Sequence, residues 1–109
     1  MGTRAQVFMK DEGVYLYQHW SGNDLMDTVI RAVNSDVGRG RQDDPEYLAR
    51  IIFCEMVKDD IAGETGYGIG NTQYADIEYL VTVDCKAKTI TETQVVGSEI
   101  LRVKRFGEE

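Results

Sequence analysis

The feature that most constrains the fold is a pair of alternating segments at the start of the chain. Residues 3–10 and residues 14–20 both place apolar and polar side chains on alternate sides, as a half-buried β-strand does. The apolar side of the first segment consists of Ala5, Val7 and Met9. Residues 11–13, Asp-Glu-Gly, separate the two segments, and the glycine suits the positive φ of a tight turn. The sequence therefore predicts an antiparallel hairpin with one buried face.

Two later segments have helical periodicity. Apolar residues recur at intervals of three and four from residue 25 to about residue 34, which predicts an amphipathic helix. Residues 44–46, Asp-Pro-Glu, are typical of a helix start, because proline fits the first helical position and an acid fits the first turn. This second helix is expected to reach about Asp60. Apolar side chains cover more than half of its circumference, so we expect it to lie centrally in the core or to contact a second copy of the chain.

The second half of the chain adds strands. The predicted strands are residues 75–84, 89–96 and 100–106. Residues 35–44 and the glycine-rich residues 63–73 are expected to form loops. The order of elements is then ββααβββ. The predicted fold class is α+β, with a single domain over residues 1–109 in which two helices pack on one face of an antiparallel sheet of about five strands.

The charge and the cysteines limit the function classes. The chain has 19 acidic and 12 basic residues, a net charge of −7. This balance opposes direct binding to nucleic acid, whose phosphates need clustered Lys and Arg. No apolar stretch is long enough to span a membrane or to form the core of a signal peptide. Cys54 and Cys85 form no CxxC motif, so both are expected to be reduced, with Cys54 inert in the core. We expect a cytoplasmic protein without a membrane partner.

Residues 14–22, VYLYQHWSG, contain the strongest candidate site. Tyr15, Tyr17 and His19 lie two positions apart, so they share one side of a strand. Trp20 stands at the strand end, close to a glycine. Such a stripe can clamp a planar ring by stacking and can bond its edge through hydroxyl and imidazole groups. The alternative is that helices cover this face and the rings belong to the core.

The glycine-rich residues 63–73 are the second candidate. Their backbone N–H groups can face an anion, with an aromatic ring among them, although the segment is neither a P-loop nor a dinucleotide fingerprint. The alternative is a long mobile connection. Arg4, near the start of the chain, would neutralise a phosphate of the ligand. The predicted ligand-binding residues are therefore Arg4, Tyr15, Tyr17, His19, Trp20, Tyr67 and Gly68.

Catalytic and metal-binding signatures are missing from the sequence. His19 is the only histidine and the cysteines do not cluster, so a zinc site is not expected. The serine nucleophile motifs GxSxG and SxxK do not occur. We therefore predict no catalytic residue, no metal ion and no cofactor.

Five motifs together resemble a family of small uncharacterised proteins of bacteria and their phages. The motifs are GTR at residues 2–4, VYLYQHWSG at 14–22, DDPEYLA at 43–49, GYGIG at 66–70 and IEYLVTVD at 77–84. The resemblance spans most of the chain, and its motifs have no assigned chemistry. It implies a short, acidic, single-domain protein that mobile elements often carry.

Three functions are compatible with the sequence. The first is a non-enzymatic binding protein, associated with a phage or mobile element, that acts on a host defence system. It would sequester a small nucleotide-like ligand or block a host protein partner. The second is a small metal-free hydrolase or phosphodiesterase in which His19 is the acid or base. The third is a structural module that forms homo-oligomers through the second helix. We favour the first, and expect it to be a homo-oligomer through that helix.

Overall fold

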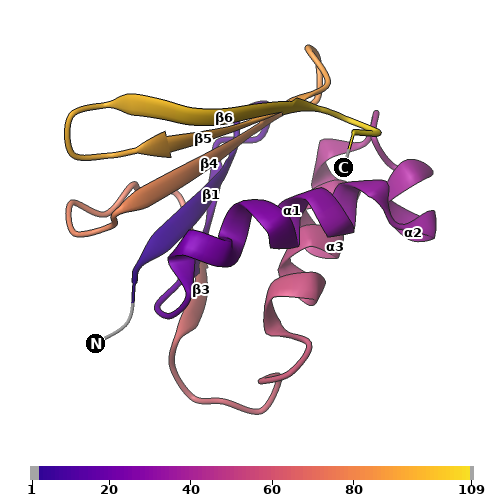
Figure 1. Cartoon of the computed structure of the whole chain (residues 1–109). Coiled ribbons are helices and arrows are strands. Elements are labelled where there is room, and N and C mark those ends of the chain that lie inside the picture. Colours follow the sequence, from indigo (N-terminus) through magenta and orange to yellow (C-terminus); the bar gives the residue numbers. More distant parts are fainter. Residues whose placement is uncertain (1–2, 109) are drawn as a thin grey trace.

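The computed structural model describes residues 3–108 and shows one sheet with its helices on one side (Figure 1). The strands are β1 (Ala5–Met9), β2 (Val14–Gln18), β3 (Tyr67–Gly70), β4 (Tyr79–Asp84), β5 (Thr89–Gln94) and β6 (Glu99–Arg105). The helices are the short 3-10 helix η1 (Gly22–Asp24) and the α-helices α1 (Leu25–Asn34), α2 (Asp36–Arg39) and α3 (Pro45–Val57).

The predicted α+β class is confirmed and the expected number of about five strands is roughly right, but the expectation of a purely antiparallel sheet is wrong. Within residues 3–108 the sheet has six strands in the order β3-β2-β1-β4-β5-β6. The additional strand, β3, lies inside the glycine-rich segment that we expected to be a loop. The sheet is also mixed, because β1 and β4 run parallel while the other neighbours are antiparallel.

The position of β3 explains why the sheet is mixed. β3 adds to the outer side of β2, and it therefore runs in the same direction as β1. The chain must then cross β2 and β1 to reach the place of β4 on the far side of β1. Residues 71–78 make this crossing, and the N–H of Glu78 donates to the carbonyl of Arg4 at 2.8 Å. We call residues 71–78 the crossover segment.

The core lies between the helices and one face of the sheet. The predicted apolar side of β1 is buried there, together with Leu16, Val81, Val83 and Ile90 from the other strands. The helices contribute Leu25, Met26, Val29, Val33, Leu48 and Ile52. Burial of each such aliphatic side chain stabilises the fold by roughly 1.5–3 kcal/mol. The opposite face carries Phe8, Tyr15 and Tyr17, and we call it the open face because the described helices leave it uncovered.

Several boundaries differ from the prediction. The expected loop at residues 35–44 contains α2, and α3 ends at Val57 rather than near Asp60.

Cys54, which we expected in the core, is exposed, because only one side of α3 faces the sheet. Cys85 is buried, and this burial raises the pKa of its thiol to about 11. Among residues 3–108, no helix has the length and apolar character needed to cross a lipid bilayer.

Candidate functional site

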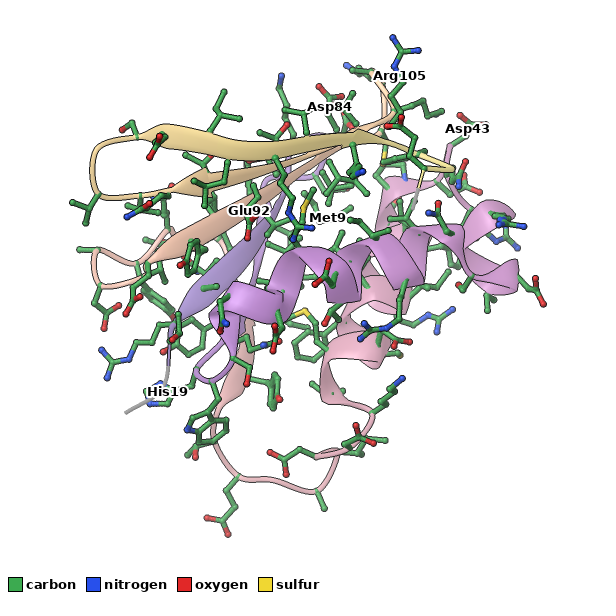
Figure 2. All side chains as sticks on the ribbon, viewed as in Figure 1. Met9, His19, Asp43, Asp84, Glu92 and Arg105 are labelled. Carbon is green, nitrogen blue, oxygen red and sulfur yellow. The ribbon has the colours of Figure 1, made fainter. Side chains whose placement is uncertain are left out.

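The aromatic side chains of β2 reach the open face because the strand alternates. Leu16 and Gln18 are buried on the helix side, so Tyr15 and Tyr17 point the opposite way. The alternative in which the helices cover these rings is therefore wrong. Both tyrosines are only partly buried, and His19, just after the end of the strand, is also partly buried. Figure 2 shows His19 at the end of the sheet where the chain begins, far from Asp43 and Arg105.

Tyr17 and His19 are joined by a hydrogen bond. The Tyr17 hydroxyl lies 2.8 Å from Nδ1 of His19. The ring of Tyr74, from the crossover segment, packs edge-on against Tyr17 with centroids 5.3 Å apart. Partial burial raises the pKa of the Tyr17 hydroxyl, Arg4 opposes that shift, and Asp76 and Tyr74 add to it. The hydroxyl therefore stays protonated at neutral pH and can donate a hydrogen bond.

Arg4 stands beside this pair and is held by an acid. Its Nη1 atom lies 2.8 Å from Oδ2 of Asp76, in an ion pair that both side chains share with solvent. A guanidinium has five N–H donors, so one carboxylate leaves donors for an anionic ligand. We call this group the aromatic cluster. It consists of Arg4, Tyr17, His19, Tyr74 and Asp76.

Gln6 fixes the crossover segment over the cluster. The sequence pattern places Gln6 on the polar side of β1, yet only 1% of its surface is exposed. Its Nε2 donates to the carbonyl of Thr72 at 3.1 Å, and its Oε1 accepts from the N–H of Tyr74 at 2.9 Å. A buried amide needs such partners, because an unsatisfied polar group costs about 1–3 kcal/mol. The two bonds position the ring of Tyr74 against Tyr17.

Two glycines of β3 leave free space next to the tyrosines. Gly68 is paired with Tyr17 and Gly70 with Tyr15, so both glycines face the open side of the sheet. A Cβ atom added to either glycine would meet nothing within 4 Å. Gly68, one of the predicted site residues, therefore forms a flat floor beside the Tyr17 ring. A planar group can lie on such a floor and contact the aromatic side chain.

Four predicted site residues are not members of the aromatic cluster, namely Gly68, which lies beside it, and Tyr15, Tyr67 and Trp20. Tyr15 faces the same side but stacks on Phe8 farther along the sheet, with centroids 4.6 Å apart. Tyr67 was expected to join the same site, but its pairing with the buried Gln18 turns it to the helix side of the sheet. Burial raises the pKa of its hydroxyl, and nearby carboxylates add to this shift. A loop prediction for residues 63–73 could not show which way Tyr67 points.

Trp20 links the two sides of the sheet at its edge. Its ring is 43% exposed and lies edge-on to His19 at 5.2 Å and to Tyr67 at 6.3 Å between centroids. The N–H of His19 donates to the carbonyl of Gly66 at 2.8 Å, which fixes the entry into β3 beside the indole. Trp20 therefore borders the aromatic cluster on its outer side.

Sequence reasoning missed Tyr74, Asp76 and Gln6. Tyr74 lies between the predicted loop and the predicted strand 75–84, and Asp76 lies in that predicted strand, which begins only at Tyr79 in the structure. Only the crossing of residues 71–78 over the sheet brings both residues to Tyr17. A signal was present in the lone aromatic ring of the polar segment Asn-Thr-Gln-Tyr, which needs a packing partner. The burial of Gln6 follows from the same crossing.

A second polar feature lies on the other side of the sheet and is structural. Glu92 is 4% exposed and points from β5 toward α1, as Figure 2 shows. Its Oε1 accepts from Nε of Arg102 at 3.1 Å, and Nη1 of Arg102 also donates to Asp27 on α1 at 3.1 Å. This triad connects β5, β6 and α1. It borders a hollow of about 440 Å³ that carries no aromatic ring in its lining.

Comparison of the chain with family models, curated proteins and solved structures finds no match. In the described part of the chain, His, Cys, Asp and Glu side chains do not gather in threes around a point where a metal ion could bind.

Proposed function

We propose that this chain is a non-enzymatic binding protein that holds a small nucleotide-like ligand at the aromatic cluster. The observation that carries the proposal is the free floor at Gly68 beside the partly exposed ring of Tyr17. A nucleobase on this floor would contact Tyr17, and base–aromatic contacts are worth about 1–3 kcal/mol per base. A nucleobase is favoured over an aliphatic ligand because the site combines ring faces with hydrogen-bonding groups at their edges.

Polar groups at the rim of the floor suit the rest of such a ligand. His19 bonds Tyr17 through Nδ1, and among residues 3–108 its Nε2 atom has no partner and can bond the edge of a base. Arg4 would bind a phosphate with the donors that Asp76 does not use. The net charge of −7 opposes long nucleic acids but not a small ligand with one or two phosphates.

The hydrolase alternative has one observation in its favour, the 2.8 Å contact between Tyr17 and His19. A general base needs a group that orients it, and a tyrosine hydroxyl can do so. Binding without turnover is preferred because the structure gives His19 no carboxylate partner among the described residues.

The wider role that we propose is action on a host defence system by a protein of a phage or mobile element. The resemblance of the GTR, YxYxHWxG and GYGIG motifs to bacterial and phage proteins supports it. Sequestering a signalling nucleotide requires a binding protein without turnover, which agrees with the preferred function. The second form of this role is that the same surface binds and blocks a host protein.

The test is a panel of cyclic and linear nucleotides, read by thermal shift and by chromatography of the recovered ligand. A ligand at 100 times its dissociation constant should stabilise the protein by about 2.7 kcal/mol. Recovery of the intact ligand supports sequestration, and recovery of a cleaved ligand supports the hydrolase. If no nucleotide shifts the unfolding temperature, the proposal is wrong.

Two glycine variants locate the site once a ligand is found. Gly68→Val should abolish binding because the valine side chain fills the floor beside Tyr17. The variant should still fold, because a Cβ atom at this position meets nothing within 4 Å and valine is favoured in strands. Gly70→Val is the matched control, since it fills equivalent space beside Tyr15 and should weaken binding less. Equal affinity of the Gly68→Val variant and the natural protein would rule out this floor as the site.

Asp76→Asn should tighten the binding of a phosphorylated ligand several-fold and leave a neutral nucleoside unchanged, because it removes the charge that competes for Arg4.

A further inference from the structure

The two edges of the sheet differ in their protection against strand addition. β6, at one edge, has four charged residues among seven and a register shift opposite Glu92 and Thr93. Charged side chains and bulges are the devices by which proteins block pairing of an edge with another chain. β3, at the other edge, has the sequence Tyr-Gly-Ile-Gly, with no charge, no proline and no register shift. Among the described residues β3 pairs only with β2, so its outer edge is available for pairing with another strand.

Ile69 and its surroundings form an incomplete apolar surface along this edge. The side chain is 66% exposed and points to the helix side, because its partner across the strands is the buried Leu16. Beside it lies a hollow of about 230 Å³ between α3 and the strands β2 and β3. Its apolar lining is Val14, Leu16, Ala49, Phe53 and Ile69. An apolar hollow next to an exposed isoleucine is suited to receive another apolar side chain.

We propose that this edge binds a second copy of the chain, with the two β3 strands antiparallel and the two Ile69 residues opposite each other. In an antiparallel pair, opposite residues share a face, so both isoleucines lie on the helix side and fill the two hollows. Gly68 of each copy then lies opposite Gly70 of the other, and no side chain obstructs the pairing on the open face. The result is a continuous sheet through two copies.

Charge on α3 favours a second copy over a different protein. Glu46 and Arg50 both border the hollow and lie one helical turn apart. Among residues 3–108 neither side chain forms an ion pair. Nη1 of Arg50 instead lies 3.8 Å from Sγ of Cys54. A two-fold axis makes the two α3 helices antiparallel, which brings the acid of one copy toward the base of the other. Such self-complementarity is what a two-fold interface requires.

The pairing has a consequence for the ligand, which rests on the proposed function. Gly68 and Gly70 of the two copies would lie side by side, between the tyrosines of one copy and those of the second. The floor beside Tyr17 would then become a glycine-lined channel with aromatic walls on both sides. The oligomeric state is measured without ligand, so failure of this inference and failure of the proposed function can be told apart.

The experiment is light scattering over a dilution series of the full chain. The natural protein should be a dimer that dissociates on dilution. Ile69→Lys should be a folded monomer, because lysine on an edge strand opposes pairing. Ile100→Lys on β6 is the matched control, since Ile100 is 63% exposed at the opposite edge, and it should remain a dimer. Circular dichroism confirms folding of each variant.

Charge reversal tests the arrangement of the helices. Glu46→Arg alone should raise the dissociation constant of the dimer about tenfold, because it places like charges together. The double variant Glu46→Arg/Arg50→Glu should restore the dimer, since both pairs are exchanged at once. A natural protein that is monomeric at every concentration overturns the proposal, as does a dimer that Ile100→Lys disrupts and Ile69→Lys does not. A double variant as weak as the single one overturns the α3 contact.

Discussion

At the scale of single residues, Gly66 determines where Trp20 lies. Its φ of +101° is a conformation that residues with a Cβ rarely adopt. A Cβ atom at this position would overlap the Cζ3 and Cη2 atoms of Trp20. The glycine therefore allows the chain to turn into β3 directly against the indole, and the carbonyl of Gly66 holds the backbone of His19. One residue thus positions the outer border of the aromatic cluster.

Gly66→Ala should lower the free energy of unfolding by about 2–4 kcal/mol, because backbone strain and displacement of the indole add. Gly97→Ala is the matched control. Gly97 also has a positive φ, of +87°, but a Cβ atom there meets nothing within 4 Å, so only the backbone cost of about 1–2 kcal/mol is expected. Urea unfolding followed by tryptophan fluorescence measures both. Equal losses in the two variants would mean that the contact with Trp20 contributes nothing.

The face of the sheet on which a site residue lies was predictable only where a regular strand carried that residue. Alternation along β2 assigns Tyr15 and Tyr17 to one face without any tertiary information. Tyr74 and Asp76 could not be predicted in this way, because their place depends on the path of the crossover segment over two strands. The side of the sheet that Tyr67 faces could not be predicted for a related reason, since it depends on the register of β3 against β2.

At the scale of elements, strong local patterns gave the right structure and weak ones did not. The hairpin and the helix ending at Asn34 were predicted because their periodicity is regular over many residues. β3 was missed because two of its four residues are glycine, which weakens a strand in isolation. Its pairing with β2 supplies the stability that its sequence lacks, and this pairing is invisible along the chain.

The turn between β4 and β5 gives a prediction about pH. Oδ1 of Asp84 accepts the N–H groups of Lys86 and Ala87, each at 3.0 Å, and Oδ2 lies 3.4 Å from Nζ of Lys10. The Ala87 N–H lowers the pKa of the carboxyl most, and Lys10 and the Lys86 N–H add to this shift while burial opposes it. A lowered folded-state pKa adds stability above the unfolded value of about 3.9, and this stability is lost as the pH falls through the folded value.

Asp84→Asn should therefore destabilise the protein near neutral pH by about 0.5–1.5 kcal/mol, since the amide keeps the turn contacts but loses their charge. The difference between the two proteins should shrink toward zero on acidification below pH 4. Chemical denaturation at a series of pH values measures this difference. A difference that stays constant with pH would show that the carboxylate charge does not stabilise the turn.

At the scale of the whole molecule, the two faces and two edges of the sheet have separate roles. The helices bury one face and form the core (Figure 1). The open face presents the aromatic cluster, with His19 at the end of the sheet near the start of the chain (Figure 2). The β6 edge is charged and bulged, while the β3 edge is apolar. The glycines of β3 serve both proposals, because they leave the floor beside the tyrosines open and permit close pairing of two copies.

The most direct test of the central claim is to map the bound ligand on the protein. Backbone amide signals of the isotope-labelled chain are followed by NMR while the best nucleotide of the panel is added. We predict that the largest changes fall on Tyr17, His19, Gly68 and Tyr74, with small changes around the hollow between α1 and β6. Changes centred on Asp27, Asn34 and Arg102 at that hollow, with Tyr17 and Gly68 unaffected, would contradict the account.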